Sequence, residues 1–92
     1  PPAGVDEELL NADDERISRI NSPAAQSYRQ SLQLLRTGSF EQARAGFETF
    51  ISENPGTAFT DNAAYWIGVS FVKLGQPDRA VGSFSEVFQK FP

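Results

Sequence analysis

The side chains that carry most enzyme chemistry are scarce in this sequence. It contains no histidine and no cysteine, which removes histidine acid–base catalysis, cysteine nucleophiles, disulfides and zinc sites built on these ligands. The acidic residues beyond residue 22 show no paired-carboxylate arrangement of the kind that glycoside hydrolysis needs, and no glycine-rich phosphate loop is present. They are Glu41, Glu48, Glu53, Asp61, Asp78 and Glu86. The sequence therefore predicts a protein that is not an enzyme and has no cofactor or metal.

Charge is concentrated at the N-terminal end of the chain. Residues 1–22 carry six acidic side chains against Arg16 and Arg19, whereas residues 23–92 carry equal numbers of acidic and basic ones. A neutral folded part lacks the basic surface typical of nucleic-acid binding. No apolar run approaches the roughly 20 residues of a membrane span. We interpret residues 1–22 as an acidic leader with a solvated face, and binding to a basic partner is the alternative.

The first residues of the chain also predict that it is a piece of a longer precursor. The sequence contains no methionine and starts with two prolines. We therefore expect a piece processed or excised from a longer precursor, so that a missing signal peptide says nothing about the compartment.

A repeat of 37 residues organises the rest of the sequence. Internal repeats of this length are typical of stacked helical hairpins. At this offset four positions keep the residue type and two keep apolar character. The identical pairs are Gly38 and Gly75, Ala43 and Ala80, Phe47 and Phe84, and Pro55 and Pro92, and the apolar pairs are Leu34 and Phe71, and Phe50 and Val87.

The first unit predicts two helices. Ser22 is a candidate N-cap, with Pro23 at the first helical position of a helix that runs to about residue 37. Gly38 then supplies a left-handed stop. The second helix is expected to start at Ser39, with Gln42 completing a capping box, and to end at Asn54. Its apolar residues recur every three or four positions and form one stripe, namely Phe40, Ala43, Phe47, Phe50 and Ile51.

The second unit predicts a similar pair of helices. Thr60 or Asp61 is the expected cap of the first, which ends near residue 74, and Pro77 begins the second. The inward stripes are Ala64, Ile67, Gly68 and Phe71 in the first helix and Ala80, Phe84, Val87 and Phe88 in the second. We expect Gly68 to lie opposite Ala80, where small residues allow two helices to approach closely. No segment alternates with the period of a strand, so the predicted class is all-α.

These residues resemble the tetratricopeptide repeat, and the predicted fold is two tandem helical hairpins, a fragment of a right-handed α-superhelix. The predicted units are residues 23–57 and 58–92, after the leader of residues 1–22. The stretch Asn62-Ala63-x-Tyr65-Trp66-Ile67-Gly68, preceded by a long connector, is similar to the C-terminal domain of the YbgF/CpoB family, periplasmic proteins of the Tol–Pal system. Members usually carry a third hairpin and a coiled coil, which we do not find here.

This resemblance implies a periplasmic, non-enzymatic adaptor that binds TolA and links constriction of the cell envelope to wall synthesis. Two alternatives remain open at this point. One is a scaffold similar to BamD, a lipoprotein of outer-membrane assembly. The other is a generic tetratricopeptide module that scaffolds or regulates a larger protein.

The resemblance also implies where a partner binds. In such arrays the first helix of each hairpin lines a concave groove, and a mostly apolar groove with two cations suits an apolar segment that carries an acidic group. By register, the groove positions are Ala25, Tyr28, Leu32, Leu35 and Arg36 in the first unit and Asn62, Tyr65, Val69, Val72 and Lys73 in the second. Trp66 is interpreted as a packing residue rather than a binding hot spot.

Two hairpins alone leave an apolar end uncovered, because about three repeats are normally needed to bury a continuous core. We expect exposed residues among Val81, Phe84 and Phe88 of the last helix. The leader is a candidate cover. Its residues 5–20 are expected to form a helix, because the apolar residues Val5, Leu9, Leu10, Ile17 and Ile20 have roughly helical spacing, and whether this helix caps the array or fills the groove stays open. A second copy of the chain or a further repeat are the other candidates, and self-association through the exposed ends is a hypothesis.

Overall fold

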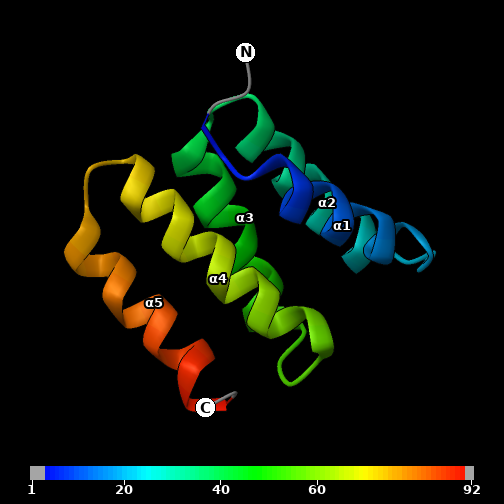
Figure 1. Ribbon diagram of the computed structural model, residues 1–92. Coiled ribbons are helices and arrows are strands. Elements are labelled where there is room, and N and C mark those ends of the chain that lie inside the picture. The colour runs from blue at the N-terminus through cyan, green and yellow to red at the C-terminus, as the bar shows by residue number, and fades with distance from the viewer. Residues whose placement is uncertain (1–3, 91–92) are drawn as a thin grey trace.

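The computed structural model describes the backbone of residues 4–90 and the side chains of residues 4–85. Within this part the chain forms five helices and no strand: α1 (Glu7–Ser18), α2 (Pro23–Arg36), α3 (Phe40–Glu53), α4 (Ala58–Lys73) and α5 (Pro77–Lys90). Each helix packs against the next one along the chain (Figure 1). The all-α helical repeat fold that the sequence predicted is confirmed.

Side-chain caps explain where the first two helices begin. The Asp6 carboxylate accepts hydrogen bonds from the backbone N–H groups of Glu8 and Leu9, at 3.0 and 3.2 Å. The Ser22 hydroxyl accepts one from the N–H of Ala25 at 3.1 Å, as the sequence predicted. Both caps satisfy N–H groups that have no partner within the helix.

One predicted capping box and one predicted helix start are wrong. Ser39 is the N-cap residue of α3, as the sequence predicted, but it makes no side-chain cap hydrogen bond, so the capping box predicted with Gln42 is not formed. The helix α4 begins at Ala58 rather than after Thr60 or Asp61. Thr57 is its cap, because the Thr57 hydroxyl accepts from the N–H of Thr60 and the Thr60 hydroxyl accepts from the N–H of Thr57.

Two glycines, 37 residues apart, end the first helix of each hairpin. Gly38 has a φ of +83° and Gly75 a φ of +75°, a left-handed conformation that glycine adopts without steric cost. The residue after each glycine donates its N–H to a carbonyl of the last helical turn, at 2.8 Å in both cases. The repeat in the sequence thus corresponds to the same helix-ending geometry at α2 and α4.

The apolar stripes of the helices enclose one core. Tyr28 lies near its centre, with its ring edge-on to the rings of Phe47, Phe50 and Phe59 at centroid distances of 5.2, 5.0 and 5.5 Å. Such edge-to-face contacts are a favoured arrangement of aromatic pairs. The buried apolar residues are Val5, Leu10, Ile17, Ala25, Tyr28, Leu32, Leu35, Ala43, Phe47, Phe50, Ala63, Ala64, Trp66, Ile67, Phe71 and Ala80.

The helices α4 and α5 approach each other closely at Gly68, which the sequence predicted to lie opposite Ala80. In the structure the ring of Phe84 lies over Gly68, so that a Cβ atom at Gly68 would be 2.4 Å from the ring. Ala80 is buried, but the aromatic ring is what makes Gly68 necessary, because the ring occupies the space of a side chain there.

The leader forms α1 over a shorter range than the expected 5–20. Leu10 and Ile17 are 0 and 2% exposed, and Val5 is also buried, whereas Leu9 and Ile20 are each 46% exposed. The short connection of residues 19–22 keeps α1 beside α2 (Figure 1). The leader therefore does not cover α5, and Val81 there stays 63% exposed. Phe84 is half-buried, and the side chain of Phe88 lies outside the described residues.

Candidate protein-interaction site

The buried carboxylate of Asp13 connects the leader to both hairpins through hydrogen bonds. Asp13 in α1 is 2% exposed. It accepts hydrogen bonds from the Tyr28 hydroxyl of α2, from Asn62 Nδ2 of α4 at 2.9 Å, and from Trp66 Nε1 of α4 at 2.7 Å. Three donors replace the water that a carboxylate loses on burial, which is what makes the burial of a charge tolerable.

The Asp13 carboxylate also affects its neighbour Tyr28. Burial of the Tyr28 hydroxyl is the main cause that raises its pKa far above the ordinary value of 10.0, and the negative charge of Asp13 and its hydrogen bond add to the rise. Tyr28 consequently stays protonated and acts as a donor at all physiological pH values.

Ion pairs between α1 and α2 flank this buried contact. Arg29 Nε lies 2.9 Å from Asp14, and Arg36 lies 3.5 Å from Glu7 and 3.6 Å from Asp14. Arg36 also donates to Asn11 at 2.9 Å. Since Arg29 and Arg36 are seven residues apart, they occupy the same face of α2 and both meet the acidic side of the leader.

The buried contact of Asp13 was not predicted from the sequence. The available signal was the position of Asp13 between Leu10 and Ile17, three and four residues away, which places an acid on the buried stripe of α1. Its donors lie 15, 49 and 53 residues further along the chain. Such a contact depends on the tertiary arrangement and has no local pattern.

The groove positions predicted in the first hairpin are not open. Ala25, Tyr28, Leu32 and Leu35 are all at most 2% exposed and belong to the same apolar cluster as Leu10 and Ile17 of the leader. Arg36 is engaged by the leader's acidic side chains. These groove positions are therefore not accessible while α1 packs against α2, and their role in partner binding stays a prediction.

The groove positions predicted in the second hairpin are more exposed than those in the first. Tyr65, Val69, Val72 and Lys73 recur at helical spacing on one face of α4. Val72 is 49% exposed, Tyr65 and Val69 are half-buried and Lys73 is exposed. Asn62, one turn before Tyr65, is half-buried and occupied by its hydrogen bond to Asp13. This part of the predicted site remains accessible.

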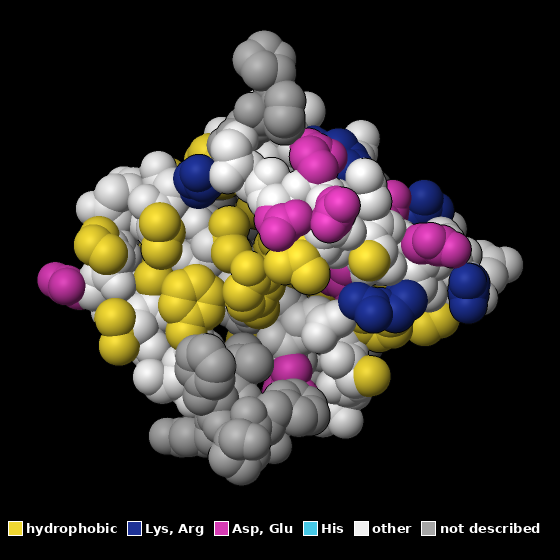
Figure 2. Space-filling view, viewed as in Figure 1, with side chains coloured by type: hydrophobic (Ala, Val, Ile, Leu, Met, Phe, Trp, Pro, Cys, Tyr) yellow, Lys and Arg dark blue, Asp and Glu magenta, His cyan; other side chains and the backbone are white. Residues whose placement is uncertain are grey.

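Together with Leu9 of α1, three of these residues form what we call the open strip: Leu9, Tyr65, Val69 and Val72. Leu9 and Tyr65 line a depression of about 290 Å³ between α1 and α4, whose exposed surface is mostly apolar. The other lining residues are Asp13, Arg16, Asp61, Asn62 and Trp66. Hydrophobic side chains gather in a band across this face of the molecule, and charged ones gather over α1 (Figure 2). An apolar band with a charged border is typical of a protein-binding surface.

Trp66 itself is a packing residue, as the sequence predicted. It is 2% exposed, its indole N–H is bonded to Asp13, and its ring packs edge-on against Tyr65 at 5.1 Å. Trp66 supports the open strip from below rather than projecting from it.

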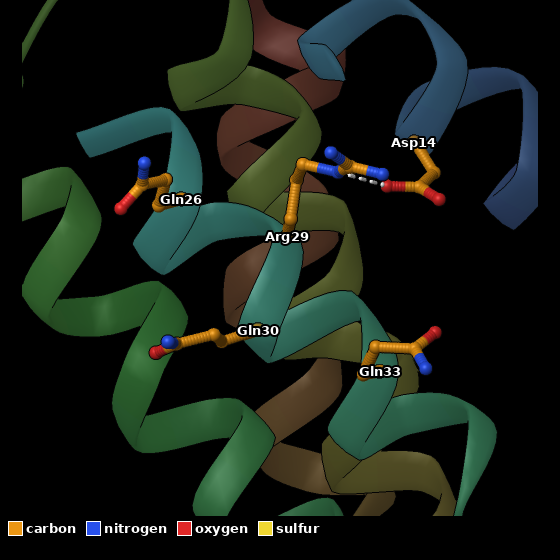
Figure 3. Close-up of a pocket in the computed structure, with 5 residues that line it drawn as sticks. All are labelled: Asp14, Gln26, Arg29, Gln30 and Gln33. Atoms are coloured by element: carbon orange, nitrogen blue, oxygen red, sulfur yellow. Dashed lines mark hydrogen bonds and ion pairs between the residues drawn. The ribbon is translucent and has the colours of Figure 1, made fainter. Parts of the chain in front are cut away.

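A second depression, of about 530 Å³, has a different character. It is lined by Asp14, Gln26, Arg29, Gln30 and Gln33, and the Arg29 side chain extends across it to Asp14 (Figure 3). Its only charged groups are already paired with each other, and glutamine amides are neither nucleophiles nor acids. We see no catalytic arrangement among the residues that line it.

Within the described residues, no group of three or more His, Cys, Asp or Glu side chains is placed to hold a metal ion. No described helix has the length and apolar character needed to cross a bilayer.

Comparison with protein families gives one match. Residues 62–92, which include most of α4 and all of α5, match the family model of the tetratricopeptide repeat. No curated protein and no solved structure shows significant similarity to the chain. The match supports a tetratricopeptide-repeat domain, and repeats of this kind generally mediate protein–protein interaction.

Proposed function

We propose that this chain is a non-enzymatic adaptor that binds a protein partner on the open strip of α1 and α4. The observation that carries the proposal is the difference between the two hairpins. The leader covers the partner-facing residues of α2, while Tyr65, Val69 and Val72 of α4 remain accessible beside the depression lined by Leu9.

The open strip favours a partner with an apolar face. Its members lie on two neighbouring helices and leave a shallow apolar depression, a shape that suits an amphipathic helix or an extended segment with apolar anchors. Lys73 lies exposed at one end of the strip, with its Nζ close to Gly4 of the leader, and provides a positive charge for an acidic group of the partner. Arg36 does not provide the second positive charge expected from the sequence, because it is paired with Glu7 and Asp14.

The finer proposal is that the partner is TolA and that the protein works in the periplasm, as part of the Tol–Pal system that coordinates constriction of the cell envelope. Its support is the similarity of residues 62–68 to the YbgF/CpoB family. In this proposal Tyr65 has a double role, since it belongs to that similar stretch and also to the open strip.

The test is an amide chemical-shift titration of the chain with the periplasmic part of TolA. Shifts should cluster on Tyr65, Val69, Val72 and Lys73. Val72→Asp places a charge in the apolar strip and should weaken binding about ten-fold or more, equivalent to roughly 1.4 kcal/mol. Thr49→Asp is the matched control, because Thr49 is exposed on α3 and should leave the affinity unchanged.

The two levels of the proposal fail in different ways. An absence of shifts at about 1 mM TolA would reject TolA as the partner. Binding that is equally weakened by Val72→Asp and Thr49→Asp, or shifts confined to α3, would reject the open strip as the binding surface.

A further inference from the structure

The face of α2 and α4 beneath the leader has the features of a binding site in its own right. Three side-chain donors converge there on one carboxylate: the Tyr28 hydroxyl, Asn62 Nδ2 and Trp66 Nε1. They come from two helices that are far apart in the sequence. None of them carries a charge. The cation paired with the carboxylate, Arg16 at 4.0 Å, belongs to α1 itself, so the face of α2 and α4 recognises the carboxylate by the direction of its hydrogen bonds.

The surroundings of these donors extend the recognition along a helix. Leu10 and Ile17, three residues before and four after Asp13, fill apolar space and are almost completely buried. Arg29 and Arg36 on α2 meet Glu7 and Asp14 on one side of the leader. The site thus binds a helix face that presents an apolar residue, an acidic residue and a second apolar residue, here Leu10, Asp13 and Ile17. Further acidic residues lie beside this face.

The helix that occupies this site is held by few side chains. In α1 only Leu10, Asp13 and Ile17 are buried, and Leu9 is 46% exposed, whereas α4 buries eight residues. An isolated helix as short as α1 is marginal in water. Local opening of a protein starts at elements with few buried contacts, so the leader is the element of this fold that can leave its place while the hairpins stay folded.

We propose that the face of α2 and α4 around Tyr28, Asn62 and Trp66 is a carboxylate-reading site for an acidic amphipathic helix of a protein partner, and that the leader is its intramolecular occupant. The partner helix presents an Asp or Glu between two aliphatic residues at the spacing of Leu10, Asp13 and Ile17, and displaces α1 on binding. This site lies under α1 and shares Trp66 with the depression beside the open strip. It goes beyond the proposed function because its partner takes the place of α1, and its test measures displacement of α1 rather than binding at Val72.

The experiment uses the full chain with a single fluorescent label. The sequence has no cysteine and one tryptophan, so a fluorophore that tryptophan quenches can be attached at Ala12→Cys, an exposed position next to Asp13. While α1 is docked, Trp66 should quench the label. The probe is a synthetic peptide of residues 5–20, which carries the pattern that the site reads. A saturable rise in emission on addition of this peptide is the expected result.

Two peptide variants separate recognition of the carboxylate from general helix binding. The peptide with Asp13→Asn should bind about ten-fold or more weakly, since it replaces a charged acceptor that receives three hydrogen bonds. The peptide with Glu15→Gln is the matched control and should bind like the parent peptide, because the Glu15 side chain is 72% exposed in the docked leader. Equal affinity of the Asp13→Asn and parent peptides would overturn the proposal.

A change in the chain itself gives an independent test. Asp13→Asn in the labelled chain weakens the intramolecular occupant, so this chain should bind the parent peptide at least about ten-fold more tightly than the unchanged chain does. Circular dichroism checks that the Asp13→Asn chain is folded. If it is not, the peptide titrations of the unchanged chain still test the proposal. No saturable rise with about 1 mM peptide in a folded chain would contradict the proposal. Dimers formed by leader exchange, seen as unquenching that depends on chain concentration alone, would identify a second copy as the occupant instead of a partner.

Discussion

A carboxylate that is removed from water is stable only where hydrogen-bond donors replace its hydration. Asp13 meets this condition through donors on α2 and α4, and it therefore couples three helices that the sequence separates widely. No described buried side-chain nitrogen or oxygen lacks a hydrogen-bond partner. The polar contact is thus complete, and removal of one member leaves the others unsatisfied.

The first prediction at the scale of the residue concerns Asp13→Asn. The amide keeps the shape of the carboxylate but turns an NH₂ group toward donors, so we expect the free energy of unfolding to fall by roughly 2–4 kcal/mol. Asp14→Asn is the control, because Asp14 is partly exposed and forms ion pairs with Arg29 and Arg36, so that its substitution should cost about 1 kcal/mol. Urea titration of both variants measures the difference, and equal losses would contradict the role assigned to Asp13.

The second prediction concerns alkaline pH. The pKa of Tyr28 is raised in the folded chain above its unfolded value of 10.0. Its contribution to stability is therefore complete below pH 10 and is lost as the pH rises further, because only the unfolded chain then ionises at this residue. We expect the free energy of unfolding to fall by up to about 1.4 kcal/mol per pH unit from this group. Tyr28→Phe lacks the hydroxyl and should remove that part of the slope, whereas an unchanged slope would contradict the burial of Tyr28.

At the scale of the element, the pairing of α4 with α5 depends on a position without a side chain. A methyl group at Gly68 would lie 2.4 Å from the ring of Phe84, while one at Gly82 on α5 would meet nothing within 4 Å. Gly68→Ala should therefore lower the free energy of unfolding by ~1–3 kcal/mol through overpacking. Gly82→Ala should raise it by about 0.5–1 kcal/mol, because alanine favours the helix over glycine. Thermal unfolding of the two variants decides the matter, and a harmless Gly68→Ala would mean that Phe84 lies elsewhere.

The helices could be predicted from the sequence because their signals are local. The cap at Ser22, the glycine stops at Gly38 and Gly75, and the apolar stripes all act within a few residues. The start of α4 was missed for a reason of the same kind, since Thr57, Thr60 and Asp61 are all residues that can cap a helix. At α4 the exchange of hydrogen bonds between Thr57 and Thr60 decides among them.

The leader shows the limit of such local reasoning. Its helix was expected, but its place was left open, because an acidic amphipathic segment has the same pattern whether it covers α5 or lies against α2. The short connection of residues 19–22 and the contacts of Asp13 decide that place. For this reason only the second-hairpin half of the predicted groove remains exposed.

At the scale of the whole molecule, the leader and the two hairpins form one compact unit. The radius of gyration is 12.2 Å, about the value of a compact domain of this length. Burial of Val5, Leu10 and Ile17 contributes roughly 1.5–3 kcal/mol for each side chain. The leader thus supplies part of the core that a third repeat supplies in longer arrays.

The same reasoning predicts weak self-association. Val81 on α5 is 63% exposed, and two copies can bring such faces together around a two-fold axis. Sedimentation equilibrium should show a concentration-dependent increase in mass, and Val81→Glu should abolish it through repulsion between like charges. Glu substitution at Thr49, exposed on α3, is the control. A strict monomer at millimolar concentration would contradict this prediction.

The placement of the leader against α2 and α4 is the claim on which the site and both proposals depend. It is tested most directly by a nuclear Overhauser spectrum of the unmodified chain, read at the single indole N–H, that of Trp66. Because Trp66 Nε1 lies 2.7 Å from the Asp13 carboxylate, a cross-peak to the Asp13 β-protons is expected, together with slow exchange of the indole proton. An indole proton that exchanges rapidly and shows no contact to residue 13 would contradict the account.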